Sequence, residues 1–139
     1  MKYFIDTNII IDFLNKKEEA IDKIINIAQD EKSVMYVNRL IVLETLRTIH
    51  FDSKKIFKEH KEKLNLFEQL NILPSIYEEA IVFSRYCHSK GVKLKGRCEA
   101  IDFLHFITAK YYNLTVVTND KDFDKLEIIY QKFIVDEKN

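Results

Sequence analysis

The sequence predicts one α/β domain over residues 1–139, built on a mostly parallel sheet. Short apolar runs alternate along the chain with longer stretches in which apolar residues recur at helical spacing. This alternation is typical of strand–helix–strand units, whose strands pair in parallel. The 139 residues include only two Gly and one Pro, which argues against a β-sandwich or barrel with many tight turns. No repeat, low-complexity tract or linker divides the chain.

Short runs of apolar and β-branched residues predict the strands, because a buried strand reads as a brief continuous apolar run. The first run ends at Asp6, and the fourth ends just before Asp120. The predicted strands are Tyr3–Ile5, Val34–Val37, Ile72–Leu73, Thr115–Thr118 and, at a sheet edge, Ile128–Val135.

Apolar residues three and four apart predict helices between these strands. Thr7 or Asn8 can cap the first helix, and Ser75 with Glu78 has the capping-box pattern for a later one. Gly91 is expected to close that later helix. The predicted helices are Ile9–Leu14, Glu18–Asp30, Leu40–Ile49, Ser53–Leu70, Ser75–Ser89, Cys98–Tyr112 and Asp122–Lys125.

The composition is that of a soluble globular protein, with 47 % hydrophobic and 32 % charged residues. The net charge of zero does not indicate a nucleic-acid partner, although basic residues can still gather on one face. Cys87 and Cys98 fit no zinc-binding spacing and are expected to be free thiols. The N-terminal apolar run is too short for a signal peptide and no stretch is long enough to span a membrane, so a cytoplasmic location is expected.

Four carboxylates stand out from this pattern. Asp6 and Asp120 each follow a predicted strand, and the carboxyl ends of parallel strands meet at one edge of the sheet, where ligands bind. Taken alone, an Asp after a strand is most often a helix cap or a turn residue. Glu44 and Asp102 are less ordinary, because each lies within an apolar helical run. A carboxylate in such a run is usually paired, coordinating or catalytic.

Clustered carboxylates need protons or cations between them, because like charges repel and lose hydration together. A site made of oxygen ligands suits Mg²⁺ or Mn²⁺. Such a metal lowers the pKa of its bound water and stabilises charge on a reacting phosphate. Phosphodiester hydrolysis is therefore the chemistry we expect.

Four short motifs resemble those of PIN-domain nucleases in order and separation. Phe4-Ile5-Asp6-Thr7-Asn8 resembles the opening motif, and Leu43-Glu44 resembles the second acid. Ile101-Asp102, followed by Ala109, resembles the third acid. Val117-Thr118-Asn119-Asp120-Lys121-Asp122-Phe123 is similar to the terminal motif. The resemblance spans nearly the whole chain, and the subgroup most like it is the VapC-like toxin ribonucleases of type II toxin–antitoxin modules.

The resemblance implies a three-layer α/β/α sandwich, dependence on Mg²⁺ or Mn²⁺, and endonucleolytic cleavage of RNA. It also implies inhibition by a small antitoxin protein and formation of a homodimer. The catalytic and metal-binding residues that it implies are Asp6, Glu44, Asp102 and Asp120, with Asp122 and Glu99 as further candidate ligands. Thr7, Asn8 and Thr118 match positions that orient the ligands, although helix capping explains Thr7 and Asn8 equally well.

Basic residues near these acids are candidates for substrate binding. Lys93, Lys95 and Arg97 lie in a loop before the Asp102 helix, where they can hold RNA phosphates, or they can belong to a plain solvated loop. Arg47 can bind phosphate or form an ion pair with Glu44 at i+3. His105 follows Asp102 by three residues and is interpreted as a packed or hydrogen-bonded histidine rather than a metal ligand.

Three other functions compete with the toxin. A housekeeping RNA-processing nuclease of the PIN type would have the same motifs, and a PIN-like RNA-binding or protein-binding domain would have the fold without catalysis. The complete set of four acids argues against the non-catalytic domain. A phosphatase with Asp6 as nucleophile is disfavoured, because Asn8 stands where such enzymes have a second Asp and no glycine-rich phosphate loop is present.

Overall fold

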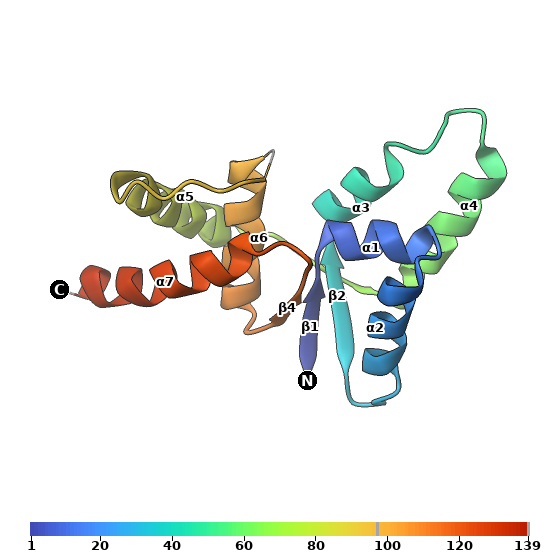
Figure 1. The fold of residues 1–139 in the computed structure, drawn as a ribbon, viewed down its shortest axis with the longest axis horizontal. Helices are drawn as coiled ribbons and strands as arrows, with labels where there is room; N and C mark the ends of the chain where they lie inside the picture. The colour runs from blue at the N-terminus through green and yellow to red at the C-terminus, as the bar shows by residue number, and fades with distance from the viewer. Residues whose placement is uncertain (97, 139) are drawn as a thin grey trace. The chain divides into compact units, whose positions relative to one another are not determined.

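A computed structural model describes residues 1–96 and 98–138 (Figure 1). The chain forms two compact units, each made of two segments. Met1–Asn71 and Leu114–Asn119 make the first, here called the sheet unit. Ile72–Asn113 and Asp120–Asn139 make the second, here called the helical unit.

The sheet unit contains a four-stranded sheet with strand order β3-β2-β1-β4. All three strand pairings are parallel, and Phe4 of β1 is in register with Tyr36 of β2 and Val116 of β4. The predicted α/β fold with a parallel central sheet is therefore confirmed. The strands are β1 (Lys2–Ile5), β2 (Val34–Asn38), β3 (Glu68–Leu70) and β4 (Thr115–Val117).

Four helices accompany the sheet, and side chains from the ends of strands cap two of them. The Asp6 carboxylate caps α1 by accepting from the N–H of Thr7, so the predicted caps at Thr7 and Asn8 were wrong. Asn38 caps α3 by accepting from the N–H of Ile41. Both caps satisfy an N–H group that a helix start leaves without a partner. The helices are α1 (Thr7–Leu14), α2 (Glu18–Ala28), α3 (Arg39–Leu46) and α4 (Lys54–Lys63).

The predicted helix Ser53–Leu70 was wrong in its second half. After α4 the chain makes a short 3-10 turn, Leu64–Leu66, and then enters β3. Phe67 is buried between them and lies edge-on to Phe13, with ring centroids 6.0 Å apart. β3 is an edge strand that pairs with β2 through main-chain hydrogen bonds. Two of its three side chains are polar, so the sequence there has no apolar run that would predict a strand. The predicted strand Ile72–Leu73 lies just beyond it and is not a strand.

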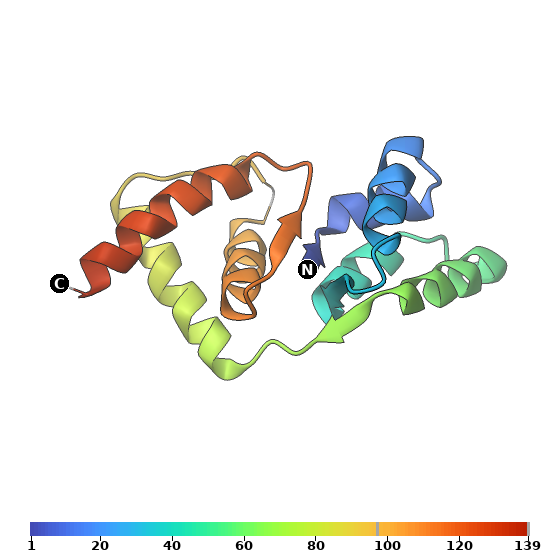
Figure 2. The same ribbon diagram turned by 90° about the horizontal axis from the view of Figure 1, so that it is seen from below.

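The helical unit consists of α5 (Pro74–Ser89), α6 (Glu99–Tyr111) and α7 (Asp122–Lys138), with α5 packed against both of the others (Figures 1 and 2). Pro74 occupies the first turn of α5, where a missing N–H costs nothing, so Ser75 is not the cap. Gly91 has a φ of 71° just past α5, which confirms its predicted role in closing that helix.

The prediction of a short helix Asp122–Lys125 followed by a strand Ile128–Val135 was wrong, because α7 is continuous. Phe123, Leu126 and Phe133 are buried at helical spacing, whereas Ile128 is 63 % and Val135 59 % exposed. The β-branched residues that suggested a strand therefore lie on the outer face of a helix. Packing outweighs a strand propensity that is itself weak and dependent on context.

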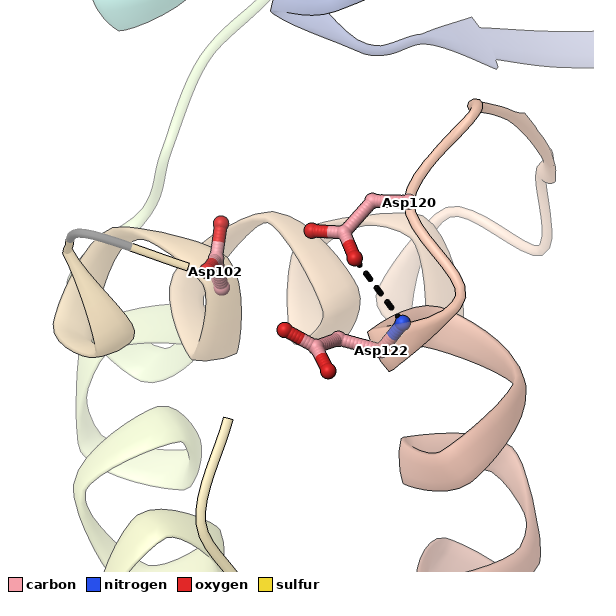
Figure 3. Close-up of side chains that lie close together, drawn as sticks. All are labelled: Asp102, Asp120 and Asp122. Carbon is pink, nitrogen blue, oxygen red and sulfur yellow. Dashed lines mark hydrogen bonds between the residues drawn. The ribbon is translucent and has the colours of Figure 1, made fainter. Parts of the chain in front are cut away.

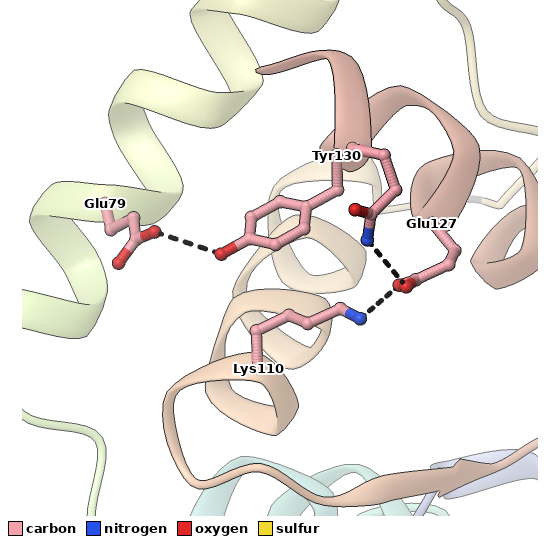
Figure 4. A network of polar contacts seen from close by, with 5 residues as sticks. Glu79, Lys110, Glu127 and Tyr130 are labelled. Atoms are coloured by element: carbon pink, nitrogen blue, oxygen red, sulfur yellow. Dashed lines mark hydrogen bonds and ion pairs between the residues drawn. The ribbon is translucent and has the colours of Figure 1, made fainter. Parts of the chain in front are cut away.

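Aromatic packing holds the three helices of this unit together. Phe83 of α5 is fully buried and contacts the rings of Phe103, Phe106, Tyr130 and Phe133 at centroid distances of 5.2–5.8 Å. A polar network borders this core (Figure 4). Lys110 of α6 forms an ion pair with Glu127 of α7, and the Tyr130 hydroxyl donates to Glu79 of α5 over 3.5 Å. Burial, followed by the nearby Glu79, raises the pKa of Tyr130 above its ordinary value.

Both cysteines are free, as predicted: Cys87 is buried and Cys98 is exposed. Among the residues that the structure describes, no helix combines the length and apolar character needed to cross a bilayer.

Candidate active site

Asp6 follows β1 directly and is 7 % exposed. Its Oδ1 atom accepts from the N–H of Thr7 at 2.8 Å. Its Oδ2 atom accepts from the Thr118 hydroxyl at 2.7 Å and from the Asn8 amide at 3.1 Å. Both carboxylate oxygens are thus oriented by neighbours, and Asp6 is at once a helix cap and a fixed acidic group.

Asn8 ties the start of α1 to the segment that follows β4. Its Nδ2 atom lies 3.4 Å from the Thr118 hydroxyl oxygen, and its Oδ1 atom accepts from the N–H of Asn119 at 3.3 Å. Asn119 in turn accepts from the Lys23 ammonium at 2.8 Å. Asn119 and Lys23 were not among the predicted site residues. Asn119 belongs to the terminal motif, but nothing in the sequence around it predicts its hydrogen bond with Lys23 of α2.

Glu44 is half-buried on α3, where the Thr7 hydroxyl donates to its Oε1 atom at 3.2 Å. Thr7 therefore contacts two of the predicted acids, Asp6 through its N–H and Glu44 through its hydroxyl. The apolar run around Glu44 does not mean burial on every side, because the adjacent Leu43 is 60 % exposed. Its contact with Thr7 is a better reason to assign Glu44 a role.

The helical unit brings together Asp102 of α6, Asp120 in the segment before α7, and Asp122 at the start of α7 (Figure 3). One carboxylate oxygen from each lies within 4.8 Å of the others. Asp122 is 4 % exposed, and the other two are half-buried. Asp120 Oδ1 accepts from the N–H of Asp122 at 2.9 Å, which fixes the turn into α7.

The donor chemistry of this group fits a hard divalent cation. Three carboxylates repel one another at such separations, and an ion placed between them removes that cost. Oxygen ligands alone suit Mg²⁺ and Mn²⁺. His105 is buried in α6 and is not a member of the group among the described residues.

Asp122 and Glu99 also hold the loop before α6. Asp122 Oδ2 accepts from the N–H groups of Lys95 and Gly96 at 2.8 and 3.1 Å. Glu99 Oε2 accepts from the N–H of Leu94 at 3.2 Å. Both residues were predicted only as possible metal ligands, and hydrogen bonds to a loop main chain leave no trace in residue spacing.

The candidate phosphate-binding residues are exposed where the structure describes them. Lys93 and Lys95 lie on this loop, and Arg47 follows the end of α3. Arg97 lies outside the described residues. The main-chain oxygen of Lys93 accepts from the Lys125 ammonium at 2.7 Å.

Comparison with solved structures shows which fold this is. VapBC2 from Rickettsia felis, solved with promoter DNA, aligns with a TM-score of 0.76 at 18 % identity, covering 91 % of this chain and 93 % of that one. FitAcB from Neisseria gonorrhoeae aligns at 0.64 and 22 %, covering 89 % and 91 %. A toxin–antitoxin complex from Klebsiella pneumoniae aligns at 0.63 and 18 %, covering 86 % and 87 %. At these identities the likeness concerns the fold.

Comparison with sequence families shows which family the chain belongs to. No curated protein matches it. The PIN domain pattern matches residues 3–129, which include segments of both units and all four predicted acids. The chain therefore belongs to the PIN-domain family of nucleases.

Proposed function

We propose that this chain is a metal-dependent endoribonuclease, and that it is the cytoplasmic toxin of a toxin–antitoxin pair. The observation that carries the proposal is that carboxylate oxygens of Asp102 and Asp120 lie within 4.8 Å of each other, beside the carboxylate of Asp122. Membership of the PIN-domain family supports the nuclease activity. The similar structures from Rickettsia, Neisseria and Klebsiella include VapBC2, FitAcB and a toxin–antitoxin complex, which supports a small antitoxin as partner.

Asp6, Glu44, Asp102 and Asp120 are the residues that we propose to bind Mg²⁺ or Mn²⁺ and to carry the reaction. The two units would then act as one PIN domain. The family match supports this assignment, because the matched residues 3–129 include all four acids.

A divalent cation bound by such acids supplies a water of lowered pKa and neutralises charge on the phosphate. The protein's own part is to hold the oxygens that bind it. Thr118 and Asn8 fix one oxygen of Asp6, and Thr7 holds Glu44. Because these partners are already bonded, the carboxylates need little reorganisation when metal and substrate arrive.

The chain would act as a homodimer. Its contacts with RNA phosphates would come from basic side chains, namely Lys93, Lys95, Arg97 and Arg47. Such contacts release counterions, so cleavage by a protein that uses them weakens as salt rises. Ionic strength therefore has to be fixed in every comparison of variants.

The test is cleavage of end-labelled RNA by the purified protein in Mg²⁺, in Mn²⁺ and in EDTA. Asp6→Asn should lower the rate by about 100-fold or more, because Asn keeps a good helix cap but loses the charge. Asp22→Asn removes the same charge from an exposed position on α2 and should cut normally. If Asp6→Asn cut RNA as fast as the parent, the mechanism would be wrong.

Growth separates the toxin from a housekeeping nuclease. Expression of the parent chain alone should arrest a bacterial host, and Asp6→Asn should not. Co-expression of a small protein from the neighbouring gene should restore growth and co-purify with the chain. An active nuclease that left growth unaffected would support RNA processing instead. A chain that bound neither Mg²⁺ nor Mn²⁺ in calorimetry would support a non-catalytic PIN-like domain.

A further inference from the structure

Asp122 is more deeply buried than Asp102 and Asp120. Its hydrogen bonds indicate that it does more than bind a metal ion. Its Oδ2 atom accepts from two successive main-chain N–H groups, those of Lys95 and Gly96. Hydrogen bonds from N–H groups to a carboxylate are charge-assisted and stronger than neutral ones. One oxygen of Asp122 is therefore already bound to the loop.

Two other side chains hold the same stretch of main chain. Glu99 accepts from the N–H of Leu94 at 3.2 Å, and the Lys125 ammonium donates to the carbonyl of Lys93 at 2.7 Å. Lys93 through Gly96 is thus fastened at each residue, while the side chains of Lys93 and Lys95 remain exposed. We call Lys93–Gly96 the anchored loop.

The anchored loop lies directly against Asp102. A Cβ atom added at Gly96 would collide with Oδ2 of Asp102 and lie 3.4 Å from its Cγ. Any side chain at position 96 would therefore force the Asp102 carboxylate to turn. Asp122 holds the N–H of this same glycine, so one hydrogen bond sets how closely the loop approaches Asp102.

We propose that Asp122 is a positioning residue that fixes the anchored loop against Asp102, rather than a principal metal ligand. Through this contact Asp122 sets the orientation of the Asp102 carboxylate and the place from which Lys93 and Lys95 extend. The part that concerns catalysis rests on the proposed nuclease function. The part that concerns the loop does not.

Amide hydrogen exchange tests the loop directly. The chain has only two glycines, so the Gly96 amide resonance can be assigned by its loss in Gly96→Ala. In Asp122→Ala the Lys95 and Gly96 amides should exchange about tenfold faster or more than in the parent, because a hydrogen bond to a charged group is lost. Asp124→Asn, which removes an exposed charge from the same turn of α7, should leave both amides unchanged.

Metal binding and kinetics test the division of roles. Asn at position 122 keeps an oxygen that can accept from the loop. We therefore expect Asp122→Asn to bind Mn²⁺ within about threefold of the parent, whereas Asp120→Asn should lose about tenfold or more. Asp122→Ala should raise KM for RNA more than Asp122→Asn does, because it releases the loop that carries the lysines. Gly96→Ala should weaken Mn²⁺ binding with Asp122 intact, since it displaces Asp102.

Two results would overturn the proposal. The first is unchanged exchange of the Lys95 and Gly96 amides in Asp122→Ala. The second is loss of Mn²⁺ binding in Asp122→Asn as complete as in Asp120→Asn, which would make Asp122 a principal ligand. A parent protein that neither bound Mn²⁺ nor cut RNA would refute the proposed function, and the amide measurement would still decide whether Asp122 holds the loop.

Discussion

The hydroxyl of Thr118 donates a 2.7 Å hydrogen bond to Oδ2 of Asp6, although 112 residues separate the two along the chain. Pairing of the first and last strands makes this contact possible. Ile5 is in register with Val117, and the N–H of Asp6 donates to the carbonyl of Val117 at 3.0 Å. The residues that follow these two strands are therefore neighbours, and Thr118 orients the acid that we place at the centre of catalysis.

Thr118→Val should lower the RNA cleavage rate by roughly 10- to 100-fold, the usual cost of losing a partner that orients a metal ligand. Thr118→Ser keeps the hydroxyl and should restore most of the activity. The measurement is the rate at saturating Mn²⁺ together with the Mn²⁺ affinity from calorimetry. Undiminished cleavage by Thr118→Val would show that the hydrogen bond to Asp6 does not matter for activity.

Thr45 offers a test of stability in the sheet unit. Its hydroxyl oxygen is buried on α3 and has no hydrogen-bond partner among the described residues. Val has the same shape without the polar atom, so Thr45→Val should raise the free energy of unfolding by about 1 kcal/mol, which urea denaturation would measure. Thr48→Val, at an exposed position, should change it by less than about 0.5 kcal/mol. Destabilisation by Thr45→Val would mean that the hydroxyl is satisfied.

The strands that position the acids could be predicted from the sequence. Short apolar runs placed β1, β2 and β4 to within a residue or so, because buried parallel strands are apolar throughout. The rule that parallel strands present their carboxyl ends at one edge then drew attention to Asp6 and Asp120. Glu44 and Asp102, which the rule does not reach, were singled out because each lies within an apolar helical run.

Hydrogen bonds between distant segments could not be predicted. Nothing near Asp122 in the sequence shows that it accepts from Lys95 and Gly96, because those residues come from a loop before α6. The strand predicted at Ile128–Val135 failed for a related reason. Its β-branched residues have a local preference, but the burial of Phe133 in the helical unit decides the structure.

The two cysteines should react very differently with iodoacetamide. Burial favours the neutral thiol and raises the pKa of Cys87 to about 11, so at pH 8 only about one molecule in a thousand carries a reactive thiolate there. Cys98 is exposed and should be alkylated first. Mass spectrometry of the native protein at pH 8 should show one label, and denaturant should allow the second. Cys98→Ser should then remain unlabelled until it unfolds, and rapid labelling of that variant would show that Cys87 is accessible.

Phe83 should be the most sensitive position in the core of the helical unit. It is fully buried on α5 and touches rings from both α6 and α7, so its removal leaves a cavity that no single neighbour can fill. Phe83→Ala should lower the free energy of unfolding by about 3–5 kcal/mol. Ile81→Ala, on the same helix but 52 % exposed, should cost less than about 1 kcal/mol. Urea denaturation followed by circular dichroism compares the two, and similar losses would mean that the ring cluster does not hold these helices together.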